Sequence, residues 1–98
     1  MPLATSETLR KEAGITARQL DYWIRQNWIR PASQRHPGSG NVRRFSQDET
    51  KRVCLMASLV AAGIAPPEAH HLTMRGEYDA NGVFRACIAG HVYVEVFP

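Results

Sequence analysis

The chain has 98 residues, a formal net charge of +3 and a hydrophobic fraction of 44%. This length allows one domain with a modest core, and the composition excludes a disordered chain. No apolar run approaches the roughly 18 residues of a membrane span, and residues 1–6 lack the features of a signal peptide. We therefore expect a cytoplasmic protein without a membrane partner.

Charge is unevenly divided along the chain. Residues 1–52 hold ten Lys and Arg against five acids, whereas residues 53–98 hold two against four. The first part is therefore basic and the second slightly acidic. A basic part of this kind favours a polyanionic partner such as nucleic acid, although a solvated basic surface has the same composition.

Two helices are predicted near the N-terminus. The first spans Ser6–Ala13 and stops at Gly14, because glycine adopts the left-handed conformation without a Cβ clash. The second runs from Thr16 through Gln26, since Thr16 followed by Gln19 is a capping box. Two helices joined by a tight glycine turn form the helix-turn-helix pattern, in which the second helix enters a DNA groove.

The second helix has two distinct faces. An apolar stripe with helical spacing is predicted to join the core, and it consists of Leu20, Trp23, Ile24 and then Trp28. The other face carries Ala17, Arg18, Asp21, Tyr22 and Arg25. Arginine can pair bidentately with guanine, whereas Asp21 would repel phosphates and is expected to orient Arg18 or Arg25. Solvated surface charges are the alternative interpretation.

Residues 32–45 predict a β-hairpin that acts as a wing. Two extended segments, Ala32–Arg35 and Asn41–Phe45, flank the turn-forming residues 36–40. A hairpin directly after a recognition helix can carry cations to phosphates or to a minor groove. The cations concerned are Arg35, Arg43 and Arg44.

The rest of the chain predicts two more helices and a hairpin. A third helix begins at the capping box Ser46–Glu49 and runs to about residue 62, and a short fourth spans Pro66–Thr73. Residues 83–88 and 91–97 alternate with period two around a glycine turn, which predicts a C-terminal β-hairpin. The predicted fold is mostly α with a small β component: a winged helix-turn-helix with four helices, a wing hairpin and a C-terminal hairpin. Residues 1–74 would form the DNA-binding domain and 75–98 an extension of the same compact unit.

The order of these motifs resembles the DNA-binding domain of the MerR family of bacterial regulators. Four segments carry the similarity across about residues 5–73: Gly14–Trp23, Ile29–Pro31, Arg43–Ser46 and Gly63–Ile64. The resemblance implies that Thr16, Arg18 and Tyr22 approach DNA, with Arg18 the best base reader, and that Arg43 or Arg44 contacts the backbone. In size the chain resembles small stand-alone versions of the fold, such as excisionases. The full predicted DNA-binding set is Thr16, Ala17, Arg18, Tyr22, Arg25, Arg35, Arg43 and Arg44.

Catalysis, cofactors and metals are not predicted. The sequence has no nucleophile motif, phosphate loop or paired catalytic carboxylates. The potential metal ligands are His70, His71, Cys87 and His91, but adjacent helical histidines diverge by about 100° and rarely share an ion. Cys54 and Cys87 form no CxxC motif and are interpreted as small reduced core residues.

Three functions remain open at this point. The first is sequence-specific binding of double-stranded DNA by a MerR-like transcriptional regulator, which predicts a two-fold homodimer. The second is an excisionase-type architectural factor that bends DNA, which predicts a cooperative head-to-tail oligomer. The third is a protein-interaction module that has lost DNA binding and docks a partner through the C-terminal hairpin.

Overall fold

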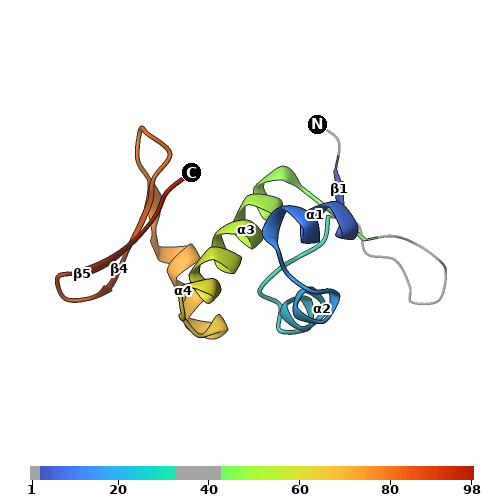
Figure 1. Cartoon of the computed structure of the whole chain (residues 1–98), viewed down its shortest axis with the longest axis horizontal. Helices are drawn as coiled ribbons and strands as arrows, with labels where there is room; N and C mark the ends of the chain where they lie inside the picture. The colour runs from blue at the N-terminus through green and yellow to red at the C-terminus, as the bar shows by residue number, and fades with distance from the viewer. Residues whose placement is uncertain (1–2, 33–42) are drawn as a thin grey trace. The chain divides into compact units, whose positions relative to one another are not determined.

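The computed structural model describes residues 3–32 and 43–98 (Figure 1). Four helices and short antiparallel strands make up this part of the chain, so the prediction of a mostly α fold with a small β component is confirmed. The chain divides into two compact units, Met1–Ala57 and Ser58–Pro98. Helix α3 (Gln47–Ala61) contributes residues to both units.

The first unit opens with the two predicted helices. Helix α1 spans Ser6–Ala13, and the Thr5 hydroxyl accepts a hydrogen bond from the Thr8 amide at 3.2 Å. Gly14 ends the helix with φ of 71°, the left-handed conformation expected from its missing Cβ. Helix α2 follows at Ala17–Arg25 after a turn of only three residues, which gives the predicted helix-turn-helix.

The start of α2 is fixed by the capping box that the sequence predicts. The Gln19 amide donates to the Thr16 hydroxyl at 3.0 Å, and the Thr16 amide donates to Gln19 Oε1 at 2.9 Å. These reciprocal bonds satisfy two amides that a helix N-terminus otherwise leaves without partners. The first turn of α2 is therefore held in place locally, before any tertiary packing.

The sequence predicted that α2 ends at Gln26, which is its C-cap, but not the conformation that ends it. Asn27 has φ of 63°, the only described non-glycine residue with positive φ. Its amide donates to the Ile24 carbonyl at 3.0 Å, and the Trp28 amide donates to the Trp23 carbonyl at 3.1 Å. These two bonds form a Schellman motif in which asparagine takes the position that glycine usually fills.

A small sheet joins the N-terminus to the segment before α3. Strand β1 (Ala4–Thr5) pairs antiparallel with β2 (Arg44–Phe45), a pairing that the sequence did not predict because two residues show no periodicity. The predicted wing hairpin falls mainly on residues 33–42, outside the described residues. At its root the Ala32 amide donates to the Arg44 carbonyl at 2.7 Å, which ties the two ends of this segment together.

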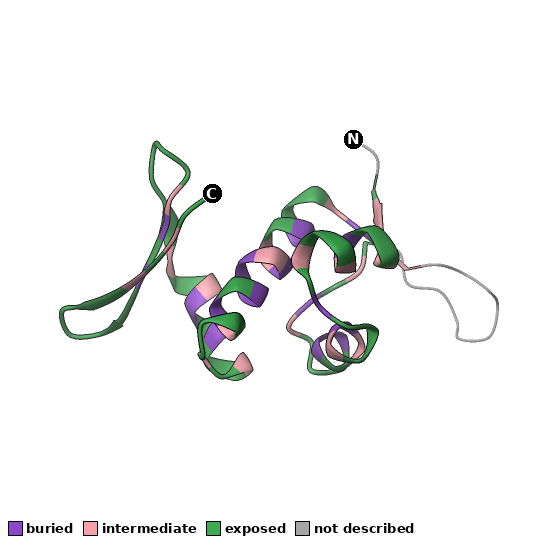
Figure 2. Cartoon of the chain, in the orientation of Figure 1, coloured by how far each residue is buried: buried purple, intermediate pink, exposed green. Residues whose placement is uncertain are grey.

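The core of the first unit contains the apolar stripe of α2. As predicted, Leu20, Trp23 and Ile24 are buried, with Trp23 only 1% exposed; Phe45 is also fully buried. Figure 2 shows α2 with buried and exposed positions on its turns. Trp28 differs from the prediction, because it lies beyond the helix and is only half-buried. The remaining buried apolar residues of this unit are Leu9, Ile15, Ile29, Val53, Leu55, Met56 and Ala57.

The second unit packs one helix against a sheet. Helix α4 spans Pro66–Arg75, two residues longer than predicted. The C-terminal hairpin is confirmed as β4 (Phe84–Ala89) paired antiparallel with β5 (Val92–Val96), but a third strand, β3 (Glu77–Tyr78), adds to the far edge of β4. The sequence missed β3 because it has only two residues. In Figure 1 the hairpin of β4 and β5 lies beside α4 within this unit.

Close packing within the second unit centres on Phe84. Phe84 is 2% exposed, Ala86 is 3% exposed, and both lie on the same face of β4 because side chains alternate along a strand. Gly76, which follows α4, lies so close that a Cβ there would overlap the Phe84 ring and would lie 2.7 Å from the Arg85 carbonyl oxygen. Glycine is therefore required at this position by the approach of the neighbouring strand.

The prediction that both cysteines are core residues was wrong for Cys87. Cys87 is exposed, since it alternates with the buried Ala86 and points to the opposite face of β4, and its thiol donates to the Gly90 carbonyl at 3.4 Å. Cys54 is half-buried, and burial together with the charge of Glu12 raises the pKa of its thiol. Within the described segments, no helix is both long and apolar enough to span a bilayer.

Candidate nucleic-acid interface

One face of α2 presents the residues that the sequence assigned to DNA. Thr16, Ala17, Arg18 and Arg25 are exposed, and Tyr22 is 44% exposed. These five residues share one face because residues three or four apart on a helix are neighbours, and we call it the recognition face after its predicted role. The opposite side of the same helix is buried, so the core fixes the orientation of this face. The Arg18 side chain forms no hydrogen bond or ion pair with any residue that the structure describes, so none of these residues occupies its five N–H donors.

Asp21 lies on the same face and binds two arginines. Its Oδ1 lies 3.1 Å from Arg43 Nη1, and its Oδ2 lies 3.5 Å from Arg25 Nε. The predicted Asp21–Arg25 pair is thus present, whereas the pair with Arg43 was not foreseen because 22 residues separate the two. Arg43 is half-buried at the end of the segment predicted as the wing. Asp21 therefore links the recognition helix to the root of that segment.

The two remaining predicted cations are Arg44, which the structure describes, and Arg35, which it does not. Arg44 is exposed on β2, where its backbone pairs with Thr5. Arg35 lies outside the described residues, so its role stays a prediction.

Tyr22 packs edge-on against Trp28, with ring centroids 5.9 Å apart and an interplanar angle of 86°. This contact orients the Tyr22 ring and leaves part of the side chain exposed on the recognition face.

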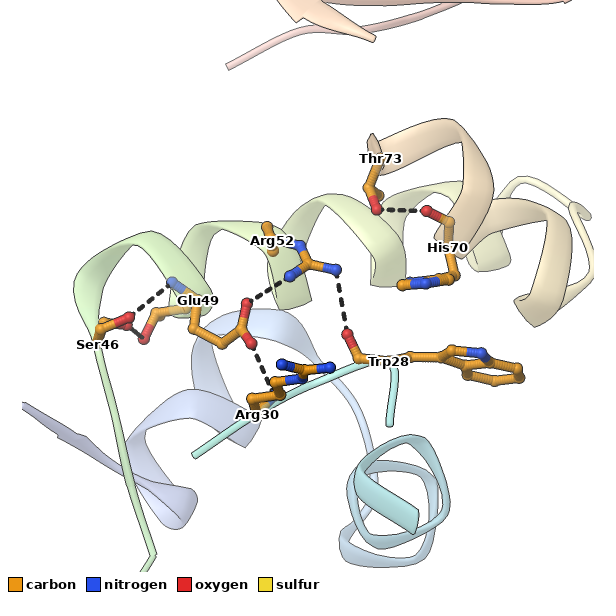
Figure 3. Close-up of polar contacts among 8 residues, drawn as sticks. Trp28, Arg30, Ser46, Glu49, Arg52, His70 and Thr73 are labelled. Atoms are coloured by element: carbon orange, nitrogen blue, oxygen red, sulfur yellow. Dashed lines mark hydrogen bonds and ion pairs between the residues drawn. The ribbon is translucent and has the colours of Figure 1, made fainter. Parts of the chain in front are cut away.

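A buried polar cluster holds the segment that follows α2 (Figure 3). Glu49 is 8% exposed; its Oε2 accepts from the Arg30 amide at 2.7 Å and its Oε1 from Arg52 Nη1 at 3.0 Å. Arg52 Nη2 then donates to the Trp28 carbonyl at 3.1 Å. Residues 28–30 have no regular structure, so the bonds to the Arg30 amide and the Trp28 carbonyl satisfy backbone groups that no ladder pairs, and the Glu49–Arg52 bond joins the two side chains that supply them. We call Glu49 and Arg52 the α3 clamp.

The side chain of Glu49 differs from its predicted role in the capping box of α3. Ser46 caps α3 as expected, since its hydroxyl accepts from the Glu49 amide at 3.1 Å. The Glu49 side chain, however, does not act as the returning arm of the capping box, because both of its oxygens bind other partners. The bond to the Arg30 amide could not be predicted from the residues near Glu49, because Arg30 lies 19 positions upstream.

Metal binding finds no support at the candidate ligands. The His70 and His71 ring centroids lie 5.9 Å apart and tilted by 59°. Among the described residues, no three His, Cys, Asp or Glu side chains gather closely enough to hold an ion.

Comparison with known families decides the class of this chain. The sequence model of a family described as MerR HTH family regulatory protein matches residues 4–75. This range includes both helices of the helix-turn-helix, β2, α3 and α4. The chain belongs to the MerR family. Members of this family are DNA-binding regulators, so the MerR assignment agrees with the resemblance seen in the motifs.

Individual relatives are named as helix-turn-helix regulators. A protein of Mycobacterium bovis and two of Mycobacterium tuberculosis, each called an uncharacterized HTH-type transcriptional regulator, are 35% identical to this chain over 71 residues. The match covers 68% of this chain but only 32% of each relative, so the chain spans about a third of their length. Every residue of the recognition face lies inside the MerR match, whereas β4 and β5 lie beyond it.

Proposed function

We propose that this MerR-family chain binds double-stranded DNA in a sequence-specific manner and regulates transcription. The observation that carries the proposal is the exposed Arg18 on a helix whose opposite face is locked into the core. A base-reading side chain must be placed by a rigid element, because hydrogen bonds to base edges are lost with small displacements. The capping box and the buried Trp23 supply that rigidity.

The proposed roles follow from the position of each side chain. Arg18 reads a base edge in the major groove, most simply guanine, whose O6 and N7 match the guanidinium fork. Thr16 donates its hydroxyl hydrogen to a phosphate, since its oxygen already accepts from Gln19. Ala17 lets the helix approach the groove closely. Tyr22 donates its phenol hydrogen to the backbone of DNA, and Arg25 adds positive charge.

Asp21 has a positioning role in this proposal. An unpaired acid facing phosphates would weaken binding, but Asp21 holds Arg43 at 3.1 Å and Arg25 at 3.5 Å. We propose that it keeps both cations on the side of α2 that faces DNA. Arg43 and Arg44, with Arg35 further along the same segment, would then contact the sugar-phosphate backbone next to the groove that Arg18 reads. Residues 1–74 form the proposed DNA-binding part.

Selection of bound sites from a random duplex library tests the proposal. A recurring motif of one or two half-sites is the expected result, and anisotropy titrations on that motif then measure affinity against salt. Each phosphate contact contributes about 0.9 to the slope of log K against log salt. A chain with no measurable duplex binding at low salt would contradict the proposal and favour the protein-interaction module.

Two substitutions distinguish base reading from general attraction. Arg18→Ala should reduce the preference for the selected site over random duplex by about 1–3 kcal/mol. Arg18→Lys keeps the charge but loses the planar fork, so it should retain non-specific affinity and lose most of the preference. Arg85→Ala is the matched control, because Arg85 is an exposed arginine on β4, outside the MerR match. Equal effects of Arg18→Ala and Arg85→Ala would refute the assigned role.

The architectural alternative differs in how several copies sit on DNA. An excisionase-type factor would protect direct repeats cooperatively and shift the mobility of bent fragments. A footprint of two inverted half-sites would instead support the regulator, because a two-fold dimer mirrors a palindrome.

A further inference from the structure

Strand β5 is an exposed edge of the C-terminal sheet. The strand order β3-β4-β5 leaves the outer side of β5 without a neighbouring strand among the residues that the structure describes. Val92 is 57% exposed and Tyr93 56% exposed. An edge strand of this kind presents a row of unpaired N–H and C=O groups that can accept another strand.

Most of the usual protections of an edge are missing from β5. Edges are commonly blunted by lysine, proline, a bulge or an inward-pointing charge. Between Val92 and Val96 there is neither lysine nor proline, and the register shift of this sheet lies in β4, between Cys87 and Ala89. The only charge on β5, Glu95, pairs with Arg85 on β4 at 3.6 Å. The edge is therefore open and nearly uncharged.

The sequence of β5 is complementary to itself. Side chains alternate along a strand, so Val92, Val94 and Val96 lie on one face while Tyr93 and Glu95 lie on the other. When a second copy runs antiparallel about Val94, valine meets valine along the whole first face. On the other face Glu95 meets Tyr93, so no like charges stand opposite each other. A register centred on Glu95 would oppose two carboxylates and is disfavoured.

We propose that β5 is a homodimer interface, at which two copies of this chain pair their β5 strands antiparallel about a two-fold axis at Val94. The two sheets then become one continuous sheet, and the valine rows of both copies lie side by side on the same face. The occupant is a second copy because the symmetric pattern of β5 matches itself in register. Two five-residue strands bury less than the roughly 1,200 Å² of a stable interface, so the expected Kd is micromolar.

Sedimentation velocity on the full chain without DNA tests this proposal. Up to about 200 µM protein, a micromolar Kd should give a concentration-dependent shift from monomer to dimer. Val92→Lys places a lysine at the exposed end of the valine row and should raise the Kd at least about tenfold. Met74→Lys is the matched control: Met74 is 65% exposed on α4, undergoes the same change, and should leave the Kd unaltered.

Three outcomes would overturn the β5 interface. The first is a monomer at every concentration, and the second is a dimer that Val92→Lys does not weaken. The third is equal loss with both lysine variants, which would place the contact on an apolar face rather than on the edge. Isotope-filtered NMR on mixed labelled and unlabelled chains provides a second measurement, in which contacts between copies must arise from residues 92–96. Because these measurements use no DNA, they are independent of the proposed DNA binding.

Discussion

Helix α2 and strand β5 both present exposed side chains, but they gain their order in different ways. Helix α2 is capped at both ends and buried along one side, so its exposed face is held by local hydrogen bonds and by the core. Among the described strands, β5 has a neighbour on one side only, which is β4. Helix α2 therefore presents a face that is ordered before any partner binds, whereas β5 presents backbone groups that can pair with another strand. Four substitutions and one chemical modification test this contrast.

The largest expected effect is loss of the core beneath α2. Trp23→Ala removes a side chain that is 1% exposed, and it should lower the free energy of unfolding by about 3–5 kcal/mol. Urea denaturation followed by circular dichroism measures the change, and DNA affinity should fall with it. Tyr22→Ala, on the exposed side of the same helix, should be far less destabilising. If Trp23→Ala cost no more than Tyr22→Ala, the core would not orient this helix.

The second-largest loss of stability is expected from overpacking beside Phe84, in the second unit. Gly76→Ala places a Cβ against the Phe84 ring and the Arg85 carbonyl, and the required shift of β4 should cost about 1–3 kcal/mol. Hydrogen exchange should show faster opening of β4 and β5, with amides of α2 unchanged. Gly82→Ala is not an equivalent control, because Gly82 has φ of 81° and would be strained for another reason. Ala80→Ser, at an exposed turn position, serves instead.

The α3 clamp should have an effect of similar size on the DNA-binding unit. Glu49→Gln removes the charge that faces Arg52 and weakens the acceptor of the Arg30 amide, so stability should fall by about 1–3 kcal/mol. DNA affinity should also fall, because residues 28–30 lead to the segment that carries Arg43. Asp48→Asn is the control, since Asp48 is an exposed neighbour on the same helix. Equal effects of the two substitutions would show that the α3 clamp does not stabilise this unit.

A smaller change in DNA affinity is expected from Asp21→Asn, and its direction distinguishes a positioning role from simple repulsion. Simple electrostatics predicts that Asp21→Asn should tighten binding, since it removes a negative charge from the recognition face. If Asp21 positions Arg43, Asp21→Asn should instead weaken binding to the selected site by about 0.2–1 kcal/mol, the usual value of an exposed pair. Asp21→Glu should restore part of the loss, and Asp21→Asn should have no effect once Arg43 is changed to Gln. Tighter binding by Asp21→Asn would contradict the positioning role.

The smallest expected effect concerns Cys54. Burial and the charge of Glu12 raise the pKa of its thiol, so the folded state favours the protonated form. The resulting contribution to stability is present below the thiol pKa of the unfolded chain and is lost as pH rises through the folded value. Alkylation followed by mass spectrometry should therefore modify the exposed Cys87 before Cys54 at neutral pH. Preferential modification of Cys54 would show that this site opens readily.

The amino-acid sequence by itself determined the features that depend on neighbouring residues. The bounds of α1, the turn at Gly14, the capping box of α2 and the buried Trp23 all follow from spacing within one or two helical turns. The MerR motifs are features of the same kind, because they combine such local signals in a fixed order. The exposed positions of Arg18 and Tyr22 follow as well, since a helix that buries one side must expose the other.

Only the tertiary structure decided which distant groups meet. The contact of Asp21 with Arg43, the use of Glu49 on Arg30 and the pairing of β1 with β2 join residues about twenty to forty positions apart. Strand β3 and the exposure of Cys87 likewise depend on where β4 lies and which face it buries. The physical reason is that a carboxylate or a two-residue strand has many possible partners, and the neighbouring residues in the sequence do not favour one of them. Folding selects among them by which backbone amides and charges would otherwise be left without a partner.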